Sequence, residues 1–299
     1  MKGGGIMETL KYKARAKINL GLDVRKRLGN GYHEVKMVMQ TVDIYDELEF
    51  KQSRTPDIIL SVESHDELGS MPNNLIFKAA KLMKEYYSIK GGIEIHLRKS
   101  IPVAAGMAGG STDAAATMLA INEMFGLGQS REKLMELALR LGADIPYCIM
   151  GGTALAEGIG EKLTALPKPP KASVLVVKPP LMVATKWVYD TLDAGIIENH
   201  PDIDGMVEAL KNGDLKGITS RMGNVLENVT ERKYSIISDI KNIMVEKGAL
   251  NALMSGSGPS VFGVYEDEQD AKAAAKYMKD TLKDRKIRAQ IFVTGFYNE

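Results

Sequence analysis

The sequence predicts a two-domain protein of the α+β class. Three observations point to this class. The chain has 299 residues, its apolar residues follow both the two-residue period of strands and the 3.6-residue period of helices, and a Pro-rich segment at 167–170 precedes a second run of elements. We therefore expect an N-terminal domain over residues 1–166 and a C-terminal domain over residues 167–299.

Strands open the N-terminal domain. Apolar residues occupy every even position from Leu10 to Val24, which is typical of one strand or of a strand pair. The glycines of segment 28–31 then predict a turn. Further strands are predicted at 35–39, 47–51 and 58–62.

Helices follow in the same domain. Residues 73–87 carry apolar residues at spacings of three and four, and Asn73 or Asn74 suits the N-cap. A strand at 93–97 then leads into a loop of small residues. Helices are expected after it at 110–125 and 131–141.

The C-terminal domain has a recognisable element order. Its predicted elements are a strand at 172–177, helices between 184 and 248, strands at 249–254 and 260–265, a helix at 268–283 and a strand at 287–293. If the first group of helices is treated as one crossover, the order is β-α-β-β-α-β, which is the ferredoxin-like pattern.

Composition narrows the class of partner. The formal net charge is +1, from 39 basic and 38 acidic residues, so no field of one sign favours nucleic acid or an anionic membrane. No apolar run approaches the ~18 residues of a membrane span, and the first residues lack the apolar core of a signal peptide. The single cysteine, Cys148, excludes a disulfide within the chain and favours the cytoplasm. Its apolar neighbours favour a buried hydrophobe over a nucleophile.

The most informative segment is the small-residue loop that enters the helix predicted at 110–125. Small side chains let backbone N–H groups approach a phosphate, and the positive end of the helix dipole points at the same place. The segment has no P-loop lysine, opens a helix instead of joining two strands, and lacks Rossmann glycine spacing. It predicts a phosphate cradle without its own lysine, the alternative being a loop packed closely against another segment. The cradle residues are Pro102, Val103, Ala104, Ala105, Gly106, Met107, Ala108, Gly109, Gly110, Ser111 and Thr112.

Lys17 offers the cation that this loop lacks. It lies two residues from Asn19 in an alternating strand, so both side chains share one face and can converge on a ligand. The alternative is a solvated strand face, which is the interpretation favoured for Lys11, Lys13 and Arg15.

Asp144 stands in an apolar stretch just past a predicted helix end. A carboxylate in such surroundings is costly unless it is paired or used in chemistry. Near a lysine it is a ready acceptor for the proton of a substrate hydroxyl. The alternative is a turn aspartate that bonds nearby amides.

A second glycine-rich segment joins the strands predicted at 249–254 and 260–265. Gly256, Ser257 and Gly258 lie in it, and its glycines can approach a ligand or the first glycine-rich loop. The alternative is a simple strand connection.

The pair Tyr32 and His33 can stack on a base and hydrogen bond to it, although a Tyr-His pair is more often structural. The remaining histidines, His65, His96 and His200, have no spacing that predicts a metal site.

Together these segments resemble the GHMP kinases, the family of galactokinase, homoserine kinase, mevalonate kinase and phosphomevalonate kinase. The matching segments run in family order over essentially the whole chain. They are residues 16–20, 31–33, 102–116, 141–146, 156–161 and 255–260. The resemblance is to the branch whose substrate is an alcohol that carries a cytidine diphosphate group. It implies an N-terminal domain like the second domain of ribosomal protein S5, a ferredoxin-like C-terminal domain, and an active site between them.

The resemblance also implies ATP as the phosphate donor and Mg²⁺ as its ion. The ATP phosphates would rest on Gly106–Thr112, with Ser111 as a magnesium ligand and the base near Asn74 and Lys99. Asp144 would accept the proton of the substrate hydroxyl. Lys17 would lower the pKa of that hydroxyl and keep Asp144 ionised.

The implied substrate site holds cytosine and the alcohol. His33 would bind the cytosine ring between Tyr32 and Tyr189, and Tyr189 stands where the family has an aromatic residue. The remaining residues of the implied substrate site are Asn19, Thr185, Gly256, Ser257 and Gly258.

Two departures from the family stand out. The first loop, residues 103–108, has alanines where many relatives carry glycine, and alanine is expected to fit only if φ there is negative. These alanines are Ala104, Ala105 and Ala108. Asp113 stands where some relatives have asparagine.

Three other functions compete with this interpretation. A homoserine or mevalonate kinase would have no cytosine for Tyr32, His33 and Tyr189 to hold. A nucleotide-binding regulator without catalysis would not need both Lys17 and Asp144. An RNA-binding protein is disfavoured by the near-zero net charge. The sequence does not decide the oligomeric state and leaves a homodimer as one option.

Overall fold

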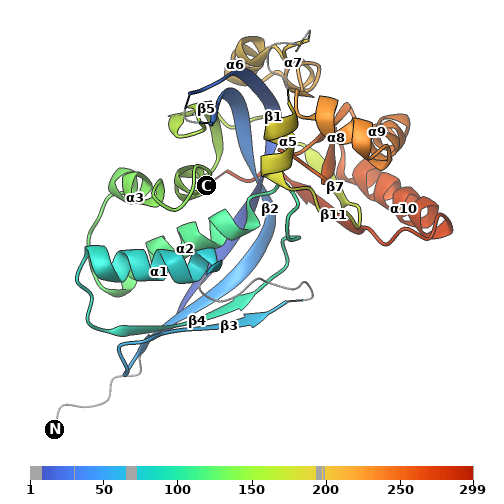
Figure 1. The fold of residues 1–299 in the computed structure, drawn as a ribbon. Coiled ribbons are helices and arrows are strands. Elements are labelled where there is room, and N and C mark those ends of the chain that lie inside the picture. Colours follow the sequence, from blue (N-terminus) through green and yellow to red (C-terminus); the bar gives the residue numbers. More distant parts are fainter. Residues whose placement is uncertain (1–8, 30, 65–72, 193–196, 198, 299) are drawn as a thin grey trace. The chain divides into compact units, whose positions relative to one another are not determined.

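The computed structural model divides the chain into two compact units (Figure 1). It describes residues 9–29, 31–64, 73–192, 197 and 199–298. The first unit comprises Met1–Arg15, Tyr45–Val103 and Ala108–Met150, and the second comprises Ala16–Ile44, Ala104–Met107 and Gly151–Glu299. The expected domain boundary after residue 166 stays a prediction.

Two long strands contribute to both units. β1 is Leu10–Arg27 and β2 is His33–Ser53. The expectation of separate strands at 35–39 and 47–51 is wrong, because β2 is continuous. Residues 37–42 are buried on both faces of the sheet, which removes the two-residue period there. In the turn before β2, Gly31 N donates to Leu28 O over 3.1 Å, while Asn30 lies outside the described residues.

In its described residues, the first unit combines four helices with a short sheet. Its other strands are β3 (Ile58–Glu63) and β4 (Gly92–Arg98). β4 pairs antiparallel with residues 47–53 of β2 and parallel with β3. The helices are α1 (Leu75–Tyr86), α2 (Gly109–Met124), α3 (Arg131–Ala138) and α4 (Ile145–Met150).

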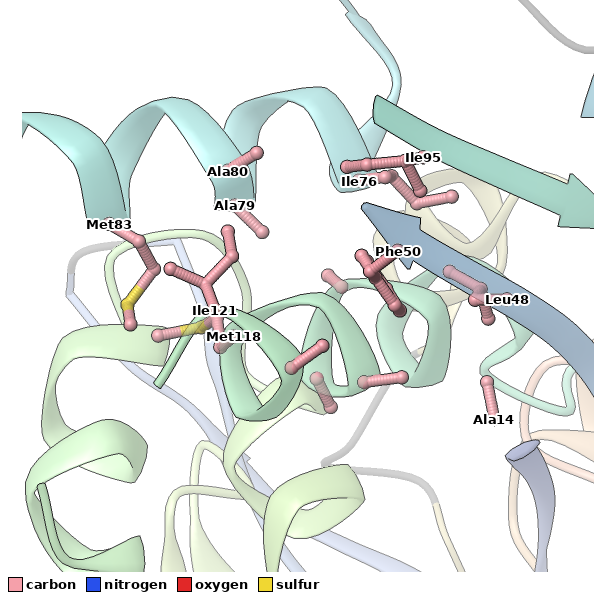
Figure 2. Close-up of a cluster of buried hydrophobic side chains, with 14 of the residues drawn as sticks. Ala14, Leu48, Phe50, Ile76, Ala79, Ala80, Met83, Ile95, Met118 and Ile121 are labelled. Carbon is pink, nitrogen blue, oxygen red and sulfur yellow. The ribbon is translucent and has the colours of Figure 1, made fainter. Parts of the chain in front are cut away.

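The core of this unit lies between the sheet and the pair α1 and α2. Figure 2 shows Met83 of α1 beside Met118 and Ile121 of α2, with Phe50 of β2 at the far end of α2. Nine side chains of α2 are buried, many of them alanines, which allows α1 to approach closely. This packing fixes the N-terminal end of α2, where the predicted phosphate cradle ends.

The second unit begins with pairs to β1 and β2. β5 (Thr153–Gly158) is antiparallel to residues 35–40 of β2 and forms a hairpin with β6 (Lys162–Ala165). β8 (Gly223–Asn224) is parallel to β1 at Gly21 and Leu22. The sequence does not predict α4, β5, β6 or β8, because elements of two to six residues show no full apolar period.

A four-stranded sheet completes the second unit and confirms the β-α-β-β-α-β order. The sheet order is β11-β7-β10-β9, with all pairs antiparallel. Its strands are β7 (Ser173–Lys178), β9 (Asn251–Met254), β10 (Val261–Tyr265) and β11 (Gln290–Gly295). α10 (Glu268–Asp284) packs on β7 and β11, beside which Figure 1 shows it, and α9 (Ile236–Glu246) packs on β9 and β10.

In the described part of the second unit, four shorter helices lie between β7 and α9. They are α5 (Thr185–Thr191), α6 (Ile203–Lys211), α7 (Leu215–Thr219) and α8 (Glu227–Lys233). Among the described residues, no helix is long and apolar enough to cross a membrane.

Candidate active site

Lys17 and Asn19 form a buried polar pair on β1. Lys17 is 6% exposed, and its Nζ donates to Asn19 Oδ1 over 2.7 Å. Asn19 is fully buried and its Nδ2 donates to Met37 Sδ over 3.2 Å. A solvated strand face is therefore wrong for Lys17. Among the described residues of the second unit no carboxylate pairs with it, so its buried charge favours an anionic partner.

The two glycine-rich loops contact each other beside this pair. Ser255 Oγ donates to Gly106 O over 2.9 Å. Gly106 has φ of +73°, and a Cβ there would lie 2.1 Å from the Ser255 carbonyl oxygen. A Cβ on Gly256 would lie 3.5 Å from Asn19 Oδ1. The expected approach of the second loop to the first is confirmed, and only glycine fits at the contact.

The expectation that the loop alanines have negative φ is wrong at Ala104 and Ala108 and holds at Ala105. Ala104 has φ of +50° and Ala108 has φ of +57°. The left-handed conformation costs an alanine about 1–2 kcal/mol. Contacts around the loop hold it in place, since Lys17 N donates to Met107 O over 3.1 Å and Thr112 N to Ala108 O over 2.9 Å. Strain of this kind is typical of ligand-binding loops.

The N-terminus of α2 has no side-chain cap among the described residues. Ala108 occupies the N-cap position, and no acidic residue lies in the first turn. By contrast, the side chains of Asn74 and Ser130 cap α1 and α3. The first N–H groups of α2 therefore stay available to an anion.

The same turn offers few ligands for a metal ion. No group of three or more His, Cys, Asp or Glu side chains gathers as a metal site in the described part of the chain, and His65 lies outside that part. Mg²⁺ that travels with nucleotide phosphates needs only one or two protein ligands. The half-buried Ser111 in the first turn of α2 fits this requirement.

Lys99 lies between two buried carboxylates in the first unit. Its Nζ contacts Asp46 Oδ2 and lies 2.8 Å from Asp113 Oδ2. Asp46 Oδ1 accepts hydrogen bonds from the N–H groups of Ser100 and Ile101, at 2.6 and 2.8 Å. This triad of Asp46, Lys99 and Asp113 connects β2 to the entry of the phosphate loop and to α2.

Burial shifts the ionisation of the triad. It would lower the pKa of Lys99, but Asp113 and Asp46 outweigh burial and raise that pKa. Burial, with Asp46 adding to it, raises the pKa of Asp113 well above its ordinary value, against the attraction of Lys99. Asp113 Oδ1 is buried with no hydrogen-bond partner among the described residues.

The two residues expected near the base of ATP have partners of their own. Asn74 Oδ1 accepts from Ile76 N over 2.8 Å as the N-cap of α1, and Lys99 belongs to the triad. Their contact with adenine stays a prediction.

Asp144 immediately precedes α4. It is half-buried, and its carbonyl oxygen accepts from Cys148 N over 3.1 Å. The Cys148 side chain packs against the apolar core, as the sequence indicates. Asp144 belongs to the first unit and Lys17 to the second, so their pairing remains a prediction.

His33 and Tyr189 form an aromatic pair in the second unit. Their ring centroids lie 5.2 Å apart at an interplanar angle of 39°. His33 is 6% exposed, whereas Tyr32 is 58% exposed. Burial and the charge of Arg27 lower the pKa of His33, against Asp190, so its ring is neutral near pH 7.

α5 connects this pair to the second glycine-rich loop. Thr185 and Tyr189 lie four residues apart on α5 and therefore share a helix face. Thr185 Oγ1 and Ser257 Oγ are 2.9 Å apart and hydrogen bonded.

Asp46 and Asn224 are not among the residues predicted from the sequence, and Ser255 is included only as part of the matching segment 255–260. Asn224 belongs to this arrangement because its Nδ2 donates to the carbonyl oxygens of Met254 and Gly256 in the second glycine-rich loop. Asp46 had a usable signal, because it interrupts a row of apolar residues with Ile44 and Leu48 on one strand face. Asn224 and Ser255 act on backbone groups far away in the sequence, and no local pattern marks such contacts.

Family models match both halves of the chain. The N-terminal domain model of the GHMP kinases matches residues 74–152, and the C-terminal model matches residues 206–284. The expected two-domain GHMP kinase fold, α+β with a ferredoxin-like C-terminal part, is confirmed.

Two curated relatives from different organisms carry the same name. The 4-diphosphocytidyl-2-C-methyl-D-erythritol kinase of Lachnospira eligens is 51% identical over 284 residues, which cover 94% of this chain and 97% of that protein. The protein of the same name from Clostridium novyi is 46% identical over 274 residues, covering 91% and 97%.

Two solved structures are similar to this chain over nearly its full length. A crystal structure of 4-(cytidine 5'-diphospho)-2C-methyl-D-erythritol kinase matches with a TM-score of 0.80 and 31% identity, covering 97% of this chain and 100% of that one. Homoserine kinase from Cytophaga hutchinsonii matches with a TM-score of 0.78 at 21% identity, covering 98% and 96%, which is a likeness of fold alone. The chain therefore belongs to the GHMP kinases and, within them, to the family of 4-diphosphocytidyl-2-C-methyl-D-erythritol kinases.

Proposed function

We propose that this chain transfers the γ-phosphoryl group of ATP to the 2-hydroxyl of 4-diphosphocytidyl-2-C-methyl-D-erythritol. The products are the 2-phosphate and ADP, and the reaction serves the non-mevalonate route to isoprenoid precursors. The observation that carries this proposal is identity of 43–51% over nine-tenths or more of the chain with relatives named for that kinase activity.

In the proposed reaction, Asp144 accepts the proton of the 2-hydroxyl. The hydroxyl oxygen forms a bond to the γ-phosphorus while the bond from that phosphorus to the departing ADP oxygen breaks. Lys17 stabilises the negative charge that develops and holds Asp144 ionised. The buried ammonium of Lys17, held by Asn19, supports this role because it is fixed in direction before substrate binds.

The phosphates of ATP occupy the first glycine-rich loop in this proposal. The uncapped N-terminus of α2 and the close backbone approach at Gly106 support that position. Mg²⁺, held by Ser111 and the phosphates, would neutralise charge on the transferring group when bound.

The aromatic pair is proposed to hold cytosine. A neutral His33 offers one donor and one acceptor, and Tyr189 presents a ring face beside it. The exposed Tyr32 would cover the other face of the base. Asn19, Thr185 and the 256–258 loop would line the rest of the substrate.

The proposal extends to the setting of the enzyme. The net charge and the single cysteine support a cytoplasmic enzyme whose partners are small molecules. A homodimer stays an option, which light scattering of the purified chain would test.

Truncating Tyr189 to alanine should weaken substrate affinity by roughly 1–3 kcal/mol, because one stacking face of the cytosine site is lost. The KM for the cytidyl substrate should rise while the KM for ATP stays level. Tyr277→Ala, at an exposed position on α10, is the matched control. An unchanged KM in Tyr189→Ala would exclude the stacking role.

The KM for the cytidyl substrate should be level from about pH 8 down to 6.5, the ordinary pKa of histidine, and rise below it. Burial lowers the pKa of His33, so the folded protein resists a proton that the unfolded chain accepts. The contribution of His33 to stability is therefore intact above pH 6.5 and declines as the pH falls through the lowered pKa. Steady-state kinetics across this range measure the profile. The rise of KM at low pH should be absent in His33→Gln and present in His96→Gln. A rise of KM centred above pH 6.5 would contradict the role of His33 in binding cytosine.

A coupled ADP-release assay tests the function itself. The purified chain is supplied with ATP, magnesium and one of three alcohols: the cytidyl substrate, homoserine or mevalonate. Turnover with the cytidyl substrate alone is expected. Turnover with homoserine or mevalonate instead would refute the assignment of Tyr32, His33 and Tyr189. No turnover with any of the three, in a folded chain that binds ATP, would favour a regulator.

A further inference from the structure

The second glycine-rich loop is held by a side chain outside the predicted site. Asn224 Nδ2 donates to two backbone carbonyl oxygens, those of Met254 and Gly256, each over 2.8 Å. Its Oδ1 accepts from Leu226 N over 3.0 Å. Both N–H groups of the Asn224 amide donate to this loop. Asn224 is 7% exposed, so water does not compete for these hydrogen bonds.

Asn224 is itself fixed to the strand that carries Lys17 and Asn19. It is paired with Leu22 of β1 in the parallel register of β8, and Val225 N donates to Leu22 O over 3.1 Å. Asn224 therefore connects β1 to the second glycine-rich loop: its backbone pairs with β1, and its side chain donates to the loop.

α8 adds two further contacts to the same loop segment. Glu227 Oε1 accepts from Met254 N over 2.7 Å, and its Oε2 pairs with Lys241 over 2.7 Å. Thr230 Oγ1 lies 3.4 Å from Ser257 O and 3.3 Å from Leu226 O, and its one hydroxyl hydrogen is shared between these two acceptors. Asn224, Glu227 and Thr230 thus contact consecutive parts of the backbone from Met254 to Ser257.

The second glycine-rich loop, held in this way, in turn fixes the position of the first glycine-rich loop. The hydrogen bond from Ser255 Oγ to Gly106 O, with no room for a Cβ on Gly106, fixes one backbone against the other. A displacement of Met254 or Gly256 must therefore move Ser255 and, with it, Gly106.

We propose that Asn224 is a positioning residue for ATP, acting through Ser255 on the backbone of the phosphate loop at Gly106. The inference rests on the proposed function, in which that loop holds the ATP phosphates. Asparagine suits the position because an amide donates twice. A carboxylate of the same shape would direct oxygen at two carbonyl oxygens, and alanine would leave both carbonyls without this partner.

The first test compares Asn224→Asp and Asn224→Ala with Asn251→Ala. Asn251 is a matched control, because its amide also donates to a backbone carbonyl of the second unit, Thr219 O over 2.8 Å, but does not contact the loop. We expect kcat/KM for ATP to fall about tenfold or more in both Asn224 variants. Asn251→Ala should stay near the unmodified value, and thermal unfolding confirms that each variant is folded. Equal effects at both positions would overturn the proposal.

A double-mutant cycle tests the route through Ser255. Because Asn224→Ala and Ser255→Ala break one chain of contacts, their effects on kcat/KM for ATP should be clearly less than additive. The pair Asn251→Ala and Ser255→Ala should be additive. Additivity in the first cycle would overturn the proposal. If Asn224→Asp does not fold, Asn224→Ser, which keeps one donor, takes its place.

Hydrogen exchange separates this inference from the proposed function. In Asn224→Ala, amide exchange over residues 254–258 should accelerate while exchange in α10 stays unchanged. Failure of the unmodified chain to phosphorylate the cytidyl substrate would refute the proposed function and leave this measurement standing. Unchanged exchange over 254–258 would refute the positioning role, whatever the substrate.

Discussion

Replacing Asp144 with asparagine should lower kcat by about 10²–10⁴-fold, the contribution expected of a positioned general base. The amide keeps the shape of the side chain but cannot take the proton of the substrate hydroxyl. ATP binding should be unchanged, because Asp144 precedes α4 and is not part of the phosphate loop. Steady-state kinetics with the cytidyl substrate, together with calorimetric titration of ATP, measure the two effects separately.

Asp57→Asn is the control for this variant. Asp57 is an exposed aspartate of the first unit, between β2 and β3, and its replacement should leave kcat unchanged. Near-normal turnover by Asp144→Asn would remove the assigned role of Asp144.

Replacing Lys99 with methionine should cost about 3–5 kcal/mol of unfolding free energy, since it leaves two buried carboxylates facing each other without their cation. The loss should extend to ATP binding. Asp46 holds the N–H groups of Ser100 and Ile101 at the entry of the phosphate loop, and Asp113 lies on α2. Denaturant unfolding measures the stability, and the KM for ATP reports how well the phosphate loop binds ATP.

Two comparisons make this result specific. Lys133→Met removes the cation of an exposed pair with Glu136 on α3 and should change stability little. Adding Asp113→Asn to Lys99→Met should restore part of the stability, because only one of the two buried carboxyl groups then remains. If Lys99→Met behaves like Lys133→Met, the triad does not support the loop.

Much of the fold was predictable because its long elements carry complete apolar periods. α1, α10 and the strands of the ferredoxin-like part follow the spacing that the sequence shows. β2 was split in two because residues 37–42 are buried on both faces, where alternation no longer reports the strand.

The site was partly predictable for a different reason. Alternation along the strand predicts that Lys17 and Asn19 share one face, and in the structure their side chains are hydrogen bonded to each other. The positive φ of Ala104 and Ala108 was not predictable, because contacts distant in sequence hold a conformation that alanine disfavours by itself.

The parts of the site that the sequence does not predict depend on contacts between distant segments. Asn224 reaches Met254 and Gly256 across thirty or more residues, and Ser255 reaches Gly106 across 149. Such pairs arise from topology, so only the folded chain reveals them.

Proton-coupled ³¹P NMR of the product tests the central claim most directly. The 2-carbon of the methylerythritol group carries a methyl group and no hydrogen, so a phosphate on its oxygen has no hydrogen three bonds away. We predict that the chain, with ATP and the cytidyl substrate, yields a new phosphomonoester resonance that is an unsplit singlet, together with ADP. A resonance split by neighbouring hydrogens, or no new phosphomonoester at all, would contradict phosphorylation at the 2-hydroxyl.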